Sequence, residues 1–98
     1  DLGQSTLDAD IQILTSVENV ACYYALFRAL KLHDATPLQL RRTCILLMRR
    51  QSPSSFRFAA ILKEYFGVED LPGTFSLKLA PWQLGRLDAS YDNFRKYF

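Results

Sequence analysis

Apolar residues recur with the period of an α-helix soon after the start of the chain. Leu7, Ile11 and Leu14 follow one another at intervals of four and three residues, and Ser5 and Asp8 have the spacing of a capping box. These features predict a short helix over residues 7–14, although Ile11 and Ile13 would also suit a brief strand. Residues 1–4 show no such period, so we expect a disordered leader there.

The most apolar stretch of the chain follows this helix. Thr15 and Glu18 again have the spacing of a capping box, which predicts a helix over about residues 16–32. Apolar side chains occupy nearly every side of this helix, with only Arg28 and Lys31 between them, and a surface helix would not carry them all round. We therefore expect it to be the central helix of the fold.

Two further helices begin at Thr-Pro and Ser-Pro pairs. Thr36-Pro37 and Ser52-Pro53 each place a capping hydroxyl before a proline in the first helical position. Gly67 stands where a glycine commonly ends a helix. The predicted buried faces consist of Leu40, Cys44, Leu47 and Met48 in one helix and Phe58, Ala59, Ile61, Leu62, Tyr65 and Phe66 in the other.

The pattern changes after Gly67. Apolar and polar residues alternate over residues 74–79, which predicts one short extended segment. Beyond Pro81 the apolar residues return to helical spacing as far as Phe98, with Asp88 as a candidate N-cap. We therefore predict a mainly α fold, a compact bundle of four to five helices in a single domain over residues 5–98.

Composition narrows the class and the setting. The 98 residues are 49% hydrophobic with a formal charge of +2, which indicates a folded core and gives little support for nucleic acid as a partner. Two cysteines, Cys22 and Cys44, make no disulfide framework, so we expect an intracellular setting, cytoplasm or nucleus. No apolar run approaches the roughly 20 residues of a membrane span. The only methionine is Met48, which suggests a domain excised from a larger protein.

The only candidate nucleophile is Cys22, and it lacks a partner. His33 is the single histidine, eleven residues further along the same predicted helix and thus roughly 16 Å away. A helix from Ser16 places Cys22 in its second turn, among apolar residues that make a thiol inert. Two cysteines and one histidine do not form a zinc site, and four scattered glycines do not form a phosphate loop. We expect no metal and no cofactor.

Two groups of side chains are candidates for binding a partner. Arg42 and Arg49 are seven residues apart and share one side of their helix, flanked by Arg41 and Arg50. This row suits an acidic protein, or phosphates if the partner is nucleic acid, but it is also typical of a solvated helix face. The aromatic candidates for anchoring a partner are Trp82, Tyr91 and Phe98, each of which is equally suited to the protein's own core.

Part of the sequence resembles the ovarian-tumour (OTU) family of papain-like cysteine proteases and deubiquitinases. The residues that carry the resemblance are Leu-Phe-Arg-Ala-Leu at 26–30, Leu-Arg-Arg at 40–42 with Met48, and Pro-Gly-Thr-Phe at 72–75, which together span about half of the chain. The resemblance implies a cysteine nucleophile at the start of the first of these segments. That position falls on Ala25, Cys22 lies three residues earlier, and no histidine follows His33.

The sequence therefore favours a non-catalytic module for protein interaction or scaffolding within a larger intracellular protein. Its partner would be another protein or another domain of the same chain. The first alternative is an OTU-like cysteine protease or deubiquitinase fragment with Cys22 as its nucleophile. The second is nucleic-acid binding through Arg41, Arg42, Arg49 and Arg50.

Overall fold

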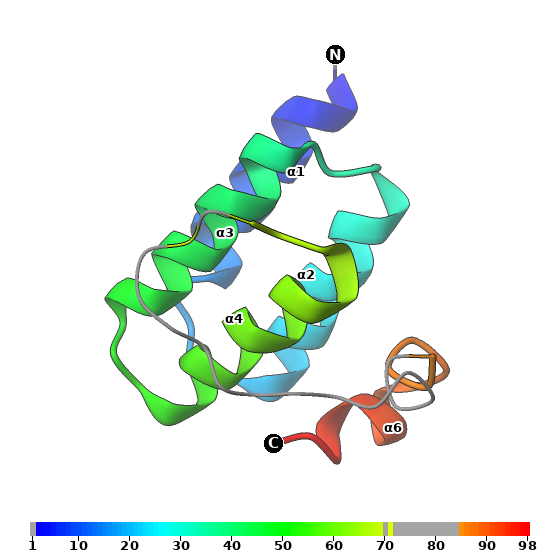
Figure 1. Ribbon diagram of the computed structural model, residues 1–98. Coiled ribbons are helices and arrows are strands. Elements are labelled where there is room, and N and C mark those ends of the chain that lie inside the picture. The colour runs from blue at the N-terminus through cyan, green and yellow to red at the C-terminus, as the bar shows by residue number, and fades with distance from the viewer. Residues whose placement is uncertain (1, 70, 72–84) are drawn as a thin grey trace.

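The computed structural model describes residues 2–69, 71 and 85–98 of the chain (Figure 1). Within these ranges the fold is mainly α, as predicted, and no described helix is long and apolar enough to cross a membrane. The extended segment predicted at 74–79 lies outside the described residues. The described residues form five helices, namely α1 (Leu2–Leu14), α2 (Val20–Leu32), α3 (Pro37–Arg49), α4 (Pro53–Phe66) and α6 (Tyr91–Arg95).

The first helix is confirmed but begins earlier than predicted. α1 begins at Leu2, so residues 2–4, which we expected to be a disordered leader, form its first turn. Leu7 and Ile11 are fully buried, and Leu14 packs at the edge of the same core, as the spacing of these residues predicts.

The start of α2 was predicted wrongly. The helix begins at Val20, and its N-cap is Asn19, whose side chain accepts hydrogen bonds from the backbone NH groups of Ala21 and Cys22. Asparagine is among the best N-cap residues. The Thr15–Glu18 pair does not cap the helix, because the Thr15 hydroxyl donates to the Ile11 carbonyl oxygen at 2.5 Å and so closes the end of α1 instead.

The loop between α1 and α2 is held by side chains from the end of α3 and the first turn of α4. The Ser54 hydroxyl donates to the Glu18 carboxylate at 2.7 Å, and this bond lowers the pKa of Glu18. The Arg50 guanidinium donates to the Ser16 carbonyl oxygen at 2.6 Å. Glu18 thus makes a tertiary contact with Ser54 and does not take part in a capping box.

The predicted starts of α3 and α4 are both confirmed. Thr36 and Ser52 are the N-caps, each in a capping box, and each is followed by proline in the first turn. Gly67 ends α4 with φ at +70°, a left-handed conformation that glycine adopts without steric cost. The two helices pack side by side in opposite directions (Figure 1).

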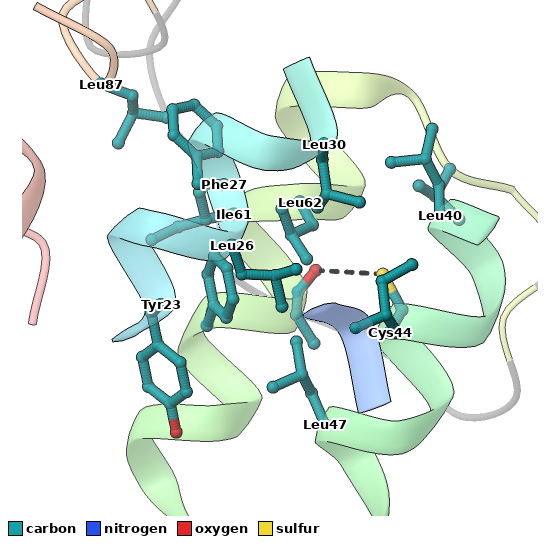
Figure 2. Packing of buried hydrophobic residues seen from close by; sticks show 14 of the residues in the cluster. Tyr23, Leu26, Phe27, Leu30, Leu40, Cys44, Leu47, Ile61, Leu62 and Leu87 are labelled. Carbon is teal, nitrogen blue, oxygen red and sulfur yellow. Dashed lines mark hydrogen bonds between the residues drawn. The ribbon is translucent and has the colours of Figure 1, made fainter. Parts of the chain in front are cut away.

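The core lies between α2 and the other helices (Figure 2). α2 packs against α1, α4 and α6, so its predicted central position is confirmed. The expectation that it is buried on nearly every side is wrong, because Ala21, Ala25 and Leu32 are exposed. Only one face is fully buried, and it consists of Tyr23, Leu26, Phe27 and Leu30.

The C-terminal segment is anchored to α2 and α4 by a polar contact. The N-cap of α6 is Ser90, and Asp88, predicted for that role, instead pairs with Lys31 of α2 and accepts a hydrogen bond of 3.0 Å from the Tyr65 hydroxyl. The hydrogen bond from the Lys31 ammonium lowers the pKa of Asp88, and the same bond raises the pKa of Lys31. These two contacts of Asp88 hold residues 85–90 against α2 and α4.

We expect Asp88→Asn to lower the free energy of unfolding by about 0.5–1 kcal/mol between pH 5 and 9, because the pair is about one-third exposed. Since folding lowers the pKa of Asp88, the contribution is complete above the unfolded pKa near 3.8 and is lost as the pH falls through the folded value. Urea denaturation at pH 7 and at lower pH should show the difference from wild type shrinking below about pH 4.

Asp92→Asn is the matched control, because the Asp92 side chain is 78% exposed and pairs only with Arg95 on its own helix. A variant difference for Asp88→Asn that stays constant down to pH 2 would contradict the ion-pair account.

Candidate protein-interaction surface

Three of the four predicted arginines lie around one hollow on the outer side of α3. This α1–α3 hollow has a volume of about 560 Å³ and is lined by α3 together with one residue of α1. α3 lies beside α1 in the fold (Figure 1). The lining residues are Gln12, Leu38, Arg41, Arg42, Ile45, Leu46 and Arg49.

Apolar residues lie between the arginines on this side of α3. Leu38 is 79% exposed, the highest value among the large hydrophobic side chains of the described residues. Ile45 and Leu46 follow two turns later and are half-buried. Because residues at intervals of three, four and seven share one side of a helix, the apolar and cationic groups form one continuous row. We call Leu38, Arg41, Arg42, Ile45, Leu46 and Arg49 the α3 surface.

The arginines of the α3 surface differ in their contacts. The Arg42 guanidinium donates to the Gln12 side-chain oxygen at 2.9 Å, which bridges α3 to α1 across the hollow. Nearer the N-terminal end of α3, the Gln39 amide donates to the Asp8 carboxylate at 3.0 Å. Arg49 makes no hydrogen bond or ion pair with any residue that the structure describes. Its charge therefore remains available at the surface.

Arg50 does not belong to this row, although its position beside Arg49 predicted that it would flank it. It is the C-cap of α3, and its side chain extends to Ser16 in the α1–α2 loop. Its role in the fold is to hold that loop.

A second hollow borders the α3 surface at the N-terminal end of α3. This α3–α4 hollow has a volume of about 330 Å³ and shares Leu38 and Arg41 with the α1–α3 hollow. Leu38 is thus a ridge between two depressions. The remaining lining residues are Pro37, Leu40, Phe66, Gly67, Val68 and Glu69.

Two of the three predicted aromatic anchors lie against the protein's own core. The Tyr91 ring lies 5.5 Å from the Tyr24 ring, measured between centroids. Phe98 is 37% exposed, and its ring centroid lies 5.3 Å from Phe94 and 5.7 Å from Tyr23. Trp82 lies outside the described residues. The two described aromatics therefore pack against aromatic rings of α2, α4 and α6.

The length of α2 separates Cys22 from the histidine, and Cys44 lies on α3. Cys22 lies in the first turn, not the second as predicted, and is half-buried. His33 is the C-cap at the other end of the helix. Cys44 is buried with its thiol 3.8 Å from the Ala59 carbonyl oxygen (Figure 2), and burial raises its pKa to about 12. The geometry brings no histidine to either thiol.

The described residues contain no cluster of three or more histidine, cysteine or acidic side chains that could hold a metal ion. No protein-family model matches the chain, and comparison with curated proteins and with solved structures gives no match. The resemblance to the OTU family therefore stays a prediction.

The apolar part of the α3 surface was missed in the sequence. Leu38, Ile45 and Leu46 are apolar but fall outside the face of this helix that was predicted to be buried. That position in the pattern could have identified them as surface residues. Apolar residues beyond the width that one buried face needs are candidates for contact with another molecule.

We expect Phe98→Ala to lower the free energy of unfolding by about 1–3 kcal/mol, because it removes a ring that contacts the rings of Tyr23, Phe58 and Phe94. Guanidinium denaturation followed by circular dichroism measures the change. The control is Phe56→Ala, which removes a ring that is 40% exposed and makes no ring contact with the described residues, and should cost less than Phe98→Ala. Equal values for the two variants would show that Phe98 contributes nothing particular to the fold.

Proposed function

We propose that the chain is a non-catalytic protein-interaction module of a larger intracellular protein, and that it binds its partner through the α3 surface. The observation that carries the proposal is an exposed leucine between two hollows, with three arginines along the same side of α3. Apolar anchors with arginine at their margin are typical of the energetic centres of protein interfaces.

The arrangement suits recognition by burial and charge together. A partner that covers Leu38 removes an almost fully exposed side chain from water, which is worth about 1.5–3 kcal/mol for complete burial. Arginines beside it can pair with carboxylates in two-bond geometry and so set the orientation of the partner. The hollows on both sides of Leu38 provide room for side chains that flank the anchor.

The non-catalytic and intracellular parts of the proposal rest on the thiols. Both cysteines are free, which fits a reducing compartment. Cys44 is buried with a pKa of about 12, so its thiolate is not formed at neutral pH. Cys22 and His33 lie at opposite ends of one helix, so they cannot share a proton.

A photoreactive amino acid at position 38 tests the binding surface in cells that express the full parent protein. We expect crosslinks to a discrete protein, reduced by the additional change Arg49→Gln because that guanidinium contributes to binding. Position 57 is the control, since Arg57 is exposed on α4 away from the α3 surface. No crosslink from position 38, or equal crosslinks from positions 38 and 57, would refute the proposal.

One observation favours the OTU-like alternative, namely that Cys22 lies in the first turn of α2, where a helix N-terminus can activate a thiol. A thiol-reactive ubiquitin probe separates this alternative from the binding module. We expect no adduct, because no histidine is within reach of the thiol. The control is Cys22→Ser, and an adduct that this change abolishes would favour the protease.

A further inference from the structure

We propose that the partner segment on the α3 surface is an acidic amphipathic helix, about three turns long, that lies along α3 beside α1. This inference rests on the proposed function and names the chemistry of the partner. Three observations carry it. They are the positive charge of the residues that line the α1–α3 hollow, the absence of a described partner for Arg49, and the length and spacing of the α3 surface.

The α1–α3 hollow has charge of one sign only. Three of its seven lining residues are arginines and none is acidic, although the whole chain carries only +2. Arg49 has no partner among the described residues, and the one that Arg42 has there is the neutral side chain of Gln12. Carboxylates brought to Arg42 and Arg49 would supply the ion pairs that no described residue of the protein provides.

The row has the dimensions of a helix contact. From Leu38 to Arg49 it follows α3 for eleven residues, or roughly 16 Å, which is three helical turns. The groups of the α3 surface repeat at helical spacing, so a second helix lying along the groove can place apolar residues at i, i+4 and i+7 against Leu38, Ile45 and Leu46. Acidic residues on either side of that apolar row then face the arginines.

The apolar ridge distinguishes this partner from nucleic acid. Phosphate recognition needs cationic and hydrogen-bonding groups, and a leucine that is 79% exposed beside Arg41 and Arg42 offers the backbone of a nucleic acid nothing. A helix with both apolar and acidic residues can cover the apolar side chains of the α3 surface and pair with its arginines. The α3–α4 hollow agrees with this choice, because its described lining is mostly apolar, with Arg41 and Glu69 as its charged residues.

The experiment uses the isotopically labelled 98-residue chain and four synthetic probes. The first is a capped peptide of about 14 residues with Leu at i, i+4 and i+7 and Glu on both flanks, long enough for three turns. The second has the same composition in scrambled order, the third has Lys in place of Glu, and the fourth is a single-stranded oligonucleotide. Amide shifts in nuclear magnetic resonance titrations locate each probe and give its dissociation constant.

We expect the acidic amphipathic peptide alone to bind at α3, with helical circular dichroism induced in the peptide. Leu38→Gln and Arg49→Gln should each weaken it about tenfold, and both positions are exposed, so the fold is retained. Arg57→Gln removes the same charge from α4 and should leave the affinity within about twofold. Raising NaCl from about 0.05 to 0.5 M should weaken binding several-fold, since the ion pairs are partly exposed.

Four results would overturn the inference. These are equal binding of the scrambled or lysine peptide, tighter binding of the oligonucleotide at α3, no peptide binding, and a monomer–dimer equilibrium that alone accounts for the α3 shifts. If crosslinks from position 38 identify a protein while the acidic peptide fails to bind, the proposed function stands and only the partner chemistry is wrong. If crosslinking also fails, the proposed function falls with it.

Discussion

The burial of one face of α2 is the constraint on which the rest of the structure depends. Tyr23, Leu26, Phe27 and Leu30 are fully buried, and complete burial of such side chains stabilises a fold by about 1.5–3 kcal/mol each. One neighbouring helix cannot cover them all, so α1, α4 and α6 contact α2 together. The aromatic rings of α6 complete this arrangement, since Phe94 lies against Phe27 with the ring centroids 5.4 Å apart.

This arrangement determines which side of α3 meets solvent. α3 packs on α4 through its buried face, and that face includes Leu40, Cys44 and Leu47. α1 is joined to α3 by side-chain hydrogen bonds from Gln39 and Arg42. Because these bonds join the two helices without closing the space between them, a hollow remains between α1 and α3. The exposed apolar residues of α3 are therefore a consequence of how α1 and α4 are placed around α2.

Local signals predicted the ends of α3 and α4 well, and failed where a capping residue had a distant competitor. Thr36-Pro37, Ser52-Pro53 and Gly67 act within a few residues, so their effect can be read from the sequence. Glu18 and Asp88 each had a suitable local role, but Ser54 and Lys31 offered tertiary partners instead. The candidate site was predicted only in part, because the arginine spacing was visible and the exposure of Leu38 was not.

By itself the sequence determined the helical class, the helix starts at Pro37 and Pro53, and the presence of several arginines on one helix, because each of these depends on residues within about two turns. Only the tertiary structure decided the rest. It buried Phe98 partly in the core, turned Arg50 toward Ser16 and left Leu38 between two hollows. Those outcomes depend on which helices meet, and the stabilisation that selects among helix contacts comes from burial between segments far apart along the chain.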